Sequence, residues 1–370
     1  MLDYGRDAGI PESARGAGAL RLYTYREHCA LVGRYQHLQE EVDLEQCAAH
    51  GIEVGRRPTG GGAIIMSPGQ LGVAIAAPAA PEESSRETLH RYARGIVAGL
   101  ASLGITASFR SKNDLEVGGR KIAGLGVYLD SRGAVLFHSS LLVDLDIETM
   151  LKVLKIPGAK LSDKAVASVE ERLTTVSREL GHRLQARDVR EQMAAGIARA
   201  FEVELSPDSL SASEMRRYRE LTEHYKSPAW IHQRSPRRDV QASSTLKTPQ
   251  GLLRVHVGIH GGTLKSVLLT GDFNVLPPGI AKLESALKWC HADRSAIAEA
   301  VQQSLDVTDL GTPPEEVAAV IWKAVSRGVR MNRRSHPVRP TGSCYFPEAN
   351  ATAPAPDDSS VMERRPHDAG

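Results

Sequence analysis

A break in the pattern of apolar residues between residues 227 and 239 constrains the fold most. The segment SPAWIHQRSPRRD gathers prolines and charges and lacks a regular apolar spacing, which is typical of a linker. Because 370 residues exceed the usual size of one core, we expect two domains, over residues 1–230 and 236–330. Beyond them the chain is rich in Pro, Ser, Ala and charged residues, so we expect a disordered tail over residues 331–370.

Charge and cysteine usage exclude several classes of protein. Lys and Arg number 46 against 44 Asp and Glu. The resulting net charge of +2 gives no sign of a basic surface that binds nucleic acid or a membrane. No apolar run approaches the ~20 residues that span a bilayer, and the N-terminus lacks a signal-peptide pattern. The 4 cysteines form no C-x-x-C pair, which argues against a metal cluster or a disulfide framework. We expect a cytoplasmic protein.

Short apolar runs predict strands in the first third of the chain. Polar, Gly or Pro breaks separate these runs, which cover residues 20–25, 30–35, 52–57, 63–66 and 71–78. A helix is expected between the second and third runs, and it ends at Gly51.

Longer patterns follow along the chain. Apolar residues at 3- and 4-residue steps predict a helix from Glu83 to Leu103, residues 114–144 indicate an antiparallel meander, and residues 147–225 are mostly helical. Past the linker, residues 251–273 predict a hairpin with its turn at residues 261–262, and three helical segments come after it. The combination predicts an α+β fold.

The stretch RRPTGGGAII, from Arg56 to Ile65, places three glycines between two arginines and a strand-like run. Glycine has no Cβ to block a ligand, and successive amide N–H groups can bind phosphate or carboxylate oxygens. Guanidinium groups also match the geometry of phosphate. The same stretch fits a flexible hairpin tip, so by itself it leaves both interpretations open.

Lys121 opens a strand directly after a tight turn, in NDLEVGGRKIAGLG. The small residues Ala123 and Gly124 let another molecule approach its ammonium group closely. A fixed lysine can neutralise phosphate charge in a transition state, although a lysine at a hairpin end is commonly just an exposed one.

Taken in order, the motifs resemble those of the lipoate–protein ligase family. The family pattern is approximately R-R-x-S-G-G-G-A-V, then N-D-L with a later K-I/V-S/A-G, then H-G-S/T-L-L-L/V-N/D-x-D, then S-V-x-x-R-V/L. RRPTGGGAI, NDLEV with RKIAG, FHSSLLVDLD and ASVEERLTTV stand here in that order, and the resemblance extends over roughly residues 1–330. It implies a biotin/lipoate protein ligase catalytic domain, with mixed, mainly antiparallel sheets flanked by helices, and a small α+β accessory domain.

The resemblance implies a two-step reaction. Lipoate attacks the α-phosphorus of ATP in the presence of Mg²⁺, giving lipoyl-AMP, and a lysine of a carrier protein then attacks the mixed anhydride. By motif, Lys121 is the catalytic residue and Asp114 a ligand of Mg²⁺. The residues implied to bind ATP or lipoyl-AMP are Arg57, Gly61, Gly62, Ala63, Ile64, Ile65, Asn113, Asp114, Lys121, Ala123 and Gly124.

Some residues depart from the family pattern. Thr59 replaces the usual serine, His138 is followed by serine rather than glycine, and MSPGQ (Met66–Gln70) replaces a frequent His-Asp-x-Gly-Asn. Thr59 and His138 are further candidates for the site, although a histidine in a strand is more often a hydrogen-bonded structural residue. Because Met66 can reshape the acyl tunnel, both lipoate and octanoate stay open as the acyl substrate.

Two other functions stay open. The superfamily also contains octanoyl- and lipoyl-transferases, which use a cysteine nucleophile and no ATP. The segment that carries this cysteine in the most similar transferases is ASFRSKNDLEVGGRK here and contains none. A non-catalytic member would only bind lipoyl carrier proteins, and it would not need the adenylate contacts implied for Lys121.

The resemblance also implies a partner. It is a lipoyl carrier protein, namely an E2 lipoyl domain, a glycine-cleavage H protein or a lipoate-binding protein of sulfur metabolism. We expect the ligase itself to be a monomer that binds neither nucleic acid nor a membrane.

Overall fold

The computed structural model describes residues 18–335 except residues 81, 111–112, 131–132, 157–162 and 274–276. The predicted disordered tail lies outside the described residues from residue 336 onward. Its first part is helical instead, because helix α13 (Pro314–Ser335) continues past residue 331. Within the described part of the chain, no helix is both long and apolar enough to cross a membrane.

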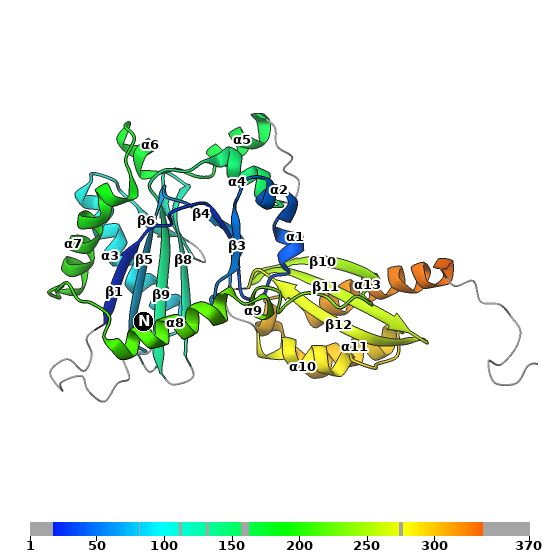
Figure 1. Cartoon of the computed structure of the whole chain (residues 1–370). Coiled ribbons are helices and arrows are strands. Elements are labelled where there is room, and N and C mark those ends of the chain that lie inside the picture. Colours follow the sequence, from blue (N-terminus) through cyan, green and yellow to red (C-terminus); the bar gives the residue numbers. More distant parts are fainter. Residues whose placement is uncertain are drawn as a thin grey trace, which may run out of the picture.

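A six-stranded sheet forms the largest layer, with the strand order β1-β5-β9-β8-β7-β6 (Figure 1). All of its neighbouring strands are antiparallel. The predicted meander is confirmed as three of these strands, whereas the short edge strand β6 was not predicted. The bounds are β1 Ala19–Tyr23, β5 Gln70–Pro78, β6 Ser108–Arg110, β7 Asp114–Val117, β8 Arg120–Leu129 and β9 Ala134–Leu142.

Helices α3 (Ser85–Ser102) and α7 (Arg190–Phe201) pack together on one face of this sheet (Figure 1). The predicted helix over residues 83–103 is confirmed, and it begins with a capping box between Ser84 and Glu87. Its apolar face joins the apolar side chains of the sheet in one core, which includes Leu71, Val73, Leu89, Tyr92, Ile96, Leu100, Phe137, Leu141, Met193 and Ile197. Burial of each large apolar side chain contributes ~1.5–3 kcal/mol, so this core fixes the position of the sheet.

A second, three-stranded sheet lies beside the first and has the order β3-β2-β4. Strand β2 (Cys29–Val32) runs parallel to β3 (Glu53–Arg56) and antiparallel to β4 (Ile64–Met66). A parallel pair needs a crossover, which α1 (Leu38–Glu41) and α2 (Leu44–Ala49) supply. The three glycines of residues 60–62 lie in the loop that connects β3 to β4 across the end of β2.

The remaining helices of the first 231 residues surround the two sheets. They are α4 Ile147–Val153, α5 Asp163–Glu170, α6 Val176–Leu180, the 3₁₀ helix Ala186–Val189, α8 Ala212–Lys226 and α9 Pro228–Ile231. Helix α9 forms one turn inside the segment that the sequence pattern assigned to a linker, because Ser227 caps it and Pro228 starts it. The irregular connection is therefore shorter than expected and runs over residues 232–241.

A third sheet, β10-β11-β12, is antiparallel and packs against the C-terminal helices (Figure 1). Its hairpin turn at Gly261-Gly262 is confirmed by positive φ angles of 55° and 79°, whereas β10 was not predicted. These elements share a separate apolar core, and the expected division into domains at residues 230 and 236 stays a prediction. The bounds are β10 Ala242–Thr248, β11 Gly251–His260, β12 Thr263–Gly271, α10 Pro278–Leu287, α11 Arg294–Ser304 and α12 Val307–Leu310.

Candidate functional site

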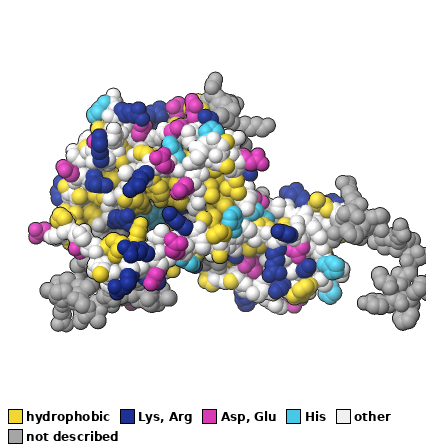
Figure 2. Space-filling model, viewed as in Figure 1, with side chains coloured by type: hydrophobic (Ala, Val, Ile, Leu, Met, Phe, Trp, Pro, Cys, Tyr) yellow, Lys and Arg dark blue, Asp and Glu magenta, His cyan; other side chains and the backbone are white. Residues whose placement is uncertain are grey.

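A cavity of about 210 Å³ lies where the three sheets meet. Figure 2 shows Lys and Arg side chains interspersed with Asp and Glu on the face in view, so no single sign of charge covers that face. The cavity is lined by the glycine loop between β3 and β4, by β7, β8 and β9, and by the C-terminal sheet. Its lining residues are Arg57, Gly60, Gly61, Gly62, Ala63, Ile64, Asn113, Asp114, Lys121, Gly124, Leu125, His138, Ser140, Gln250, Gly251 and Asp272.

Lys121 is fixed in this cavity through its backbone. Its N–H donates to the carbonyl of Arg172 at 2.9 Å, and its own carbonyl accepts from the N–H of Thr174 at 2.9 Å. These partners belong to the segment ASVEERLTTV, so two of the sequence motifs meet at one residue. The Nζ of Lys121 lies 2.7 Å from Oδ1 of Asp114 on the neighbouring strand β7. The ammonium group therefore has a defined position while about a third of the side chain, 32%, stays exposed to a ligand.

Gly124 leaves the space that the lysine side chain occupies. A Cβ at this position would lie 3.2 Å from Nζ of Lys121 and 3.4 Å from Oγ of Ser140. The first distance is shorter than most contacts of a Cβ atom. The glycine therefore lets the side chain of Lys121 lie close against β8.

Arg57 holds the glycine loop. Its guanidinium donates to the carbonyl of Gly60 at 2.8 Å and to that of Gly62 at 2.6 Å. Burial lowers the pKa of Arg57 to about 10, so the group still carries its charge at neutral pH. Gly61, between these two carbonyls, has a φ of +89°, which glycine adopts without strain and other residues rarely adopt.

Arg56, its neighbour in sequence, lies outside the lining of the cavity. Its side chain is 3% exposed and donates to the carbonyls of Gly33 at 2.9 Å, Gln36 at 2.7 Å and Ile231 at 2.9 Å. Trp230 returns a hydrogen bond of 2.8 Å from Nε1 to the carbonyl of Arg56. Arg56 therefore fixes helix α9 to the small sheet.

His138 and Thr59 contact each other beside the cavity. Nε2 of His138 lies 2.7 Å from Oγ1 of Thr59, which is itself 2% exposed. Burial, and next the charge of Arg57, lower the pKa of His138 to about 3, so the imidazole is neutral at physiological pH. This contact agrees with the structural interpretation of His138, although its side chain also lines the cavity.

The structure brings most of the residues predicted for the site together. Arg57, Gly61, Gly62, Ala63, Ile64, Asn113, Asp114, Lys121, Gly124 and His138 line the cavity. Ile65 and Ala123 do not, because their side chains point into hydrophobic cores and are 6% and 0% exposed. Thr59 reaches the site only through His138. Met66 is likewise buried at 3% and lies outside this lining.

The sequence patterns missed the contribution of the C-terminal sheet. Gln250, Gly251 and Asp272 line the same cavity, and the N–H of Gly61 donates to the carbonyl of Phe273 at 2.7 Å. Asp272 and Phe273 end the segment of residues 251–273 that the apolar pattern predicted as a hairpin, and that pattern gives no signal for a role in the site. The C-terminal sheet therefore forms one wall of the site.

Residues 12–198 match the family model of the lipoyl protein ligase A/B catalytic domain. The chain belongs to this family. Similar proteins include lipoate–protein ligase 1 of Staphylococcus aureus, 26% identical over 74% of this chain and 81% of the relative. The lipoate-protein ligase LplJ of Bacillus subtilis is 24% identical over 76% of this chain and 84% of LplJ. The octanoyltransferase LipM of Symbiobacterium thermophilum is 28% identical over 60% of this chain and 93% of LipM.

Solved structures of this family share the fold. LipL1 of P. falciparum, solved with lipoate, gives a TM-score of 0.62 at 17% identity. The match covers 83% of this chain and 88% of the LipL1 chain. A bipartite lipoate protein ligase of Thermoplasma acidophilum, studied with its E2 lipoyl domain, gives a TM-score of 0.54 at 26% identity. The match covers 60% of this chain and 87% of the ligase chain. The expected α+β fold of the lipoate ligase family is confirmed, and the protein is an enzyme of the group that contains lipoate ligases and octanoyltransferases.

Proposed function

We propose that the protein is an ATP-dependent lipoate–protein ligase. It would activate lipoate to lipoyl-AMP and transfer the lipoyl group to a lysine of a lipoyl carrier protein. The observation that carries this proposal is the position of Lys121, whose ammonium group lies in the cavity between the glycine loop and Asp114. Acyl-adenylate chemistry needs such a cation beside the phosphate, whereas acyl transfer through a thioester needs a reactive thiol.

The cysteines of this chain favour the ligase over the transferase. Burial, and next the charge of Glu53, raise the pKa of Cys29 to about 12, and burial also raises the pKa of Cys47. A nucleophilic cysteine needs the opposite shift, because the thiolate is the reactive form. No cysteine lines the cavity among the described residues, and the segment from Ala107 to Lys121 contains none.

The residues of the cavity have distinct roles in the proposed reaction. In the first step a carboxylate oxygen of lipoate bonds to the α-phosphorus and pyrophosphate leaves; in the second, a carrier amine bonds to the acyl carbon, loses a proton and releases AMP. Lys121 would lie beside both the carboxyl and the phosphate oxygens and compensate negative charge in each transition state. Arg57 would keep the glycine loop in shape for the acyl-adenylate.

Asp114 and Asp272 offer the oxygen atoms that Mg²⁺ prefers, and both line the cavity. The donor set therefore fits a Mg²⁺ ion, with Asp114 as the ligand that the motif implies. When bound, the ion would neutralise part of the charge on the phosphates. Lys121 forms an ion pair with Asp114, the same carboxylate that would bind the ion. This arrangement would hold the lysine and the ion on the same side of the nucleotide.

The proposal is tested on intact carrier proteins by mass spectrometry. The protein is incubated with lipoate or octanoate, Mg²⁺ and one carrier at a time: an E2 lipoyl domain, a glycine-cleavage H protein and a lipoate-binding protein of sulfur metabolism. We expect one lipoyl mass on one carrier, only when ATP is present. Transfer from an octanoylated carrier without ATP would show a transferase, and binding of a carrier with neither reaction would show a non-catalytic member.

A further inference from the structure

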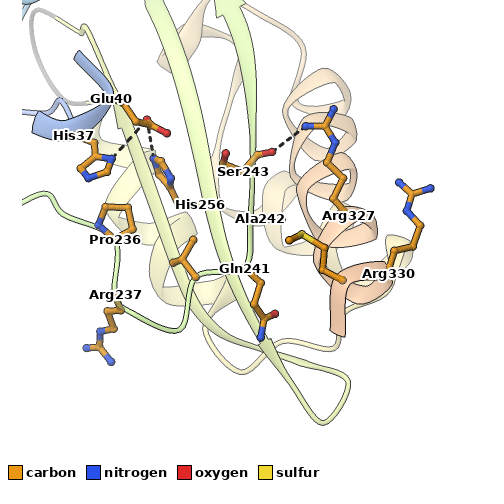
Figure 3. A pocket seen from close by; sticks show the side chains of 12 residues that line it. His37, Glu40, Pro236, Arg237, Gln241, Ala242, Ser243, His256, Arg327 and Arg330 are labelled. Carbon is orange, nitrogen blue, oxygen red and sulfur yellow. Dashed lines mark hydrogen bonds and ion pairs between the residues drawn. The ribbon is translucent and has the colours of Figure 1, made fainter. Parts of the chain in front are cut away.

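Two histidines and a glutamate lie together at the junction of α1 and the C-terminal sheet, away from the lining of the ligase cavity. Nδ1 of His37 is 3.8 Å from Oε2 of Glu40, and Nε2 of His256 is 3.6 Å from the same oxygen. Figure 3 shows the three side chains turned toward one another at one end of a cavity of about 670 Å³. His37 is the N-cap of α1 and Glu40 lies within that helix, whereas His256 comes from β11.

Two of these groups lack a hydrogen-bond partner. Nδ1 of His37 and Oε2 of Glu40 are buried, and neither makes a hydrogen bond within the described structure. Their mutual distance of 3.8 Å is longer than a hydrogen bond. Because buried polar atoms in native proteins nearly always have a partner, these two atoms point to a ligand between them.

The donor atoms suit a cation. Two imidazole rings and one carboxylate bring their ligand atoms within 4.8 Å of one another. Imidazole nitrogen and carboxylate oxygen are ligands of zinc and related ions.

Arg254 is the positive charge closest to the cluster. Its Nε lies 3.5 Å from Oε2 of Glu40, but its guanidinium makes a shorter contact of 2.9 Å with Glu41. Two carboxylates, those of Glu40 and Glu41, therefore face one guanidinium. Figure 3 shows that Arg237 and Arg330, which line the same cavity, point away from the histidines.

We propose that His37, Glu40 and His256 form a binding site for a divalent transition-metal ion, with Zn²⁺ as the best fit. Ligand atoms ~2.0–2.2 Å from a tetrahedral zinc are roughly 3.4 Å apart, and the three ligand atoms here all lie within 4.8 Å of one another. Nε2 of His256 is also 3.0 Å from Oγ1 of Thr270, a hydrogen bond that the metal replaces. The fourth position opens to the cavity, where a water molecule completes the coordination.

The metal joins two parts of the chain that are far apart in sequence. It holds β11 against α1 and so reinforces the contact that Arg254 already makes with Glu41. Since the same C-terminal sheet forms a wall of the ligase cavity, the metal stabilises the arrangement in which the carbonyl of Phe273 accepts from Gly61. Binding to the folded state alone also raises the stability of the whole protein.

The proposal is tested on the full chain, freed of metal with a chelator and titrated calorimetrically with Zn²⁺. We expect one tight site, weakened at least about 100-fold in His37→Ala and Glu40→Gln, and a melting temperature that rises with Zn²⁺ in the parent protein but not in these two variants. His182→Ala, which removes an exposed histidine just past the C-terminal end of α6, is the matched control and keeps the site. His37 and Glu40 are only partly buried, so these variants carry the test if His256→Ala fails to fold.

Co²⁺ supplies a second readout that does not depend on affinity. Bound at this site it gives the absorption of nitrogen and oxygen ligands, without the intense charge-transfer band of a cobalt–thiolate bond. Such a band would assign the metal to cysteines. It would overturn the proposal, as would Zn²⁺ affinity that is absent in the parent protein or unchanged in His37→Ala.

Discussion

Nζ of Lys121 and Oδ1 of Asp114 lie 2.7 Å apart across the β7–β8 hairpin. The two side chains are 32% and 29% exposed, and an ion pair in such a position contributes only ~0–1 kcal/mol to stability. Its main effect is positional, because it holds the ammonium group in the cavity that the glycine loop also lines. Lys121 is therefore expected to matter for the reaction and little for folding.

Replacing Lys121 with alanine should reduce lipoylation of the carrier ~10²–10³-fold, since the variant loses a cation that compensates charge in the transition state. The melting temperature should change little. Lys247→Ala removes an exposed lysine from β10 and is the matched control. Rates near those of the parent protein would remove Lys121 from its proposed role.

Gly124→Ala should lower the rate of lipoylation by about 10- to 100-fold without unfolding the protein, because small displacements of catalytic groups have effects of this size. The new Cβ would lie 3.2 Å from Nζ of Lys121 and would push the ammonium group away from β8. Steady-state kinetics should show the loss in kcat rather than in KM. An unchanged kcat would mean that the lysine moves aside without consequence.

Acid should destabilise the protein through His138. The pKa of this histidine is about 3 when folded and ~6.5 when unfolded, so the unfolded state binds more protons between these values. Stability is complete above about pH 6.5 and falls as the pH decreases toward 3. Thermal unfolding between pH 7 and pH 5 should therefore show a shallower pH dependence in His138→Gln than in the parent protein, and an equal dependence would contradict this assignment.

A variant with serine at Cys29, Cys47, Cys290 and Cys344 should keep ATP-dependent lipoylation within a few-fold of the parent rate. The reason is that no thioester forms in the proposed reaction. Loss of activity in a folded variant, together with a covalent acyl-enzyme detected by intact mass in the parent, would establish a transferase instead.

Much of this site could be predicted because its residues follow one another in short motifs. The glycine loop, the pair Asn113 and Asp114, and Lys121 each carry a local signature, and adjacent antiparallel strands bring them together. Ile65 and Ala123 were predicted from the same motifs, but neighbours in a strand point to opposite faces. Their side chains are therefore buried in the cores instead.

Contacts between distant parts of the chain had no local signature. Asp272 reaches the cavity, and His256 reaches His37, only because the C-terminal sheet packs beside α1. Strand β10 was missed because its buried positions include Ser244 and Thr248, which do not give an apolar alternation. Helix α1 was missed because it has 4 residues, too few for a helical period.

The most direct test of the central claim is ATP–pyrophosphate exchange measured without any carrier protein. An acyl-adenylate forms reversibly, so labelled pyrophosphate should enter ATP only when lipoate or octanoate is added, and Lys121→Ala should abolish the exchange. Lipoate-dependent exchange in the parent protein would identify an AMP-forming ligase. No exchange by a folded protein that still acylates a carrier from an octanoylated donor would contradict the account.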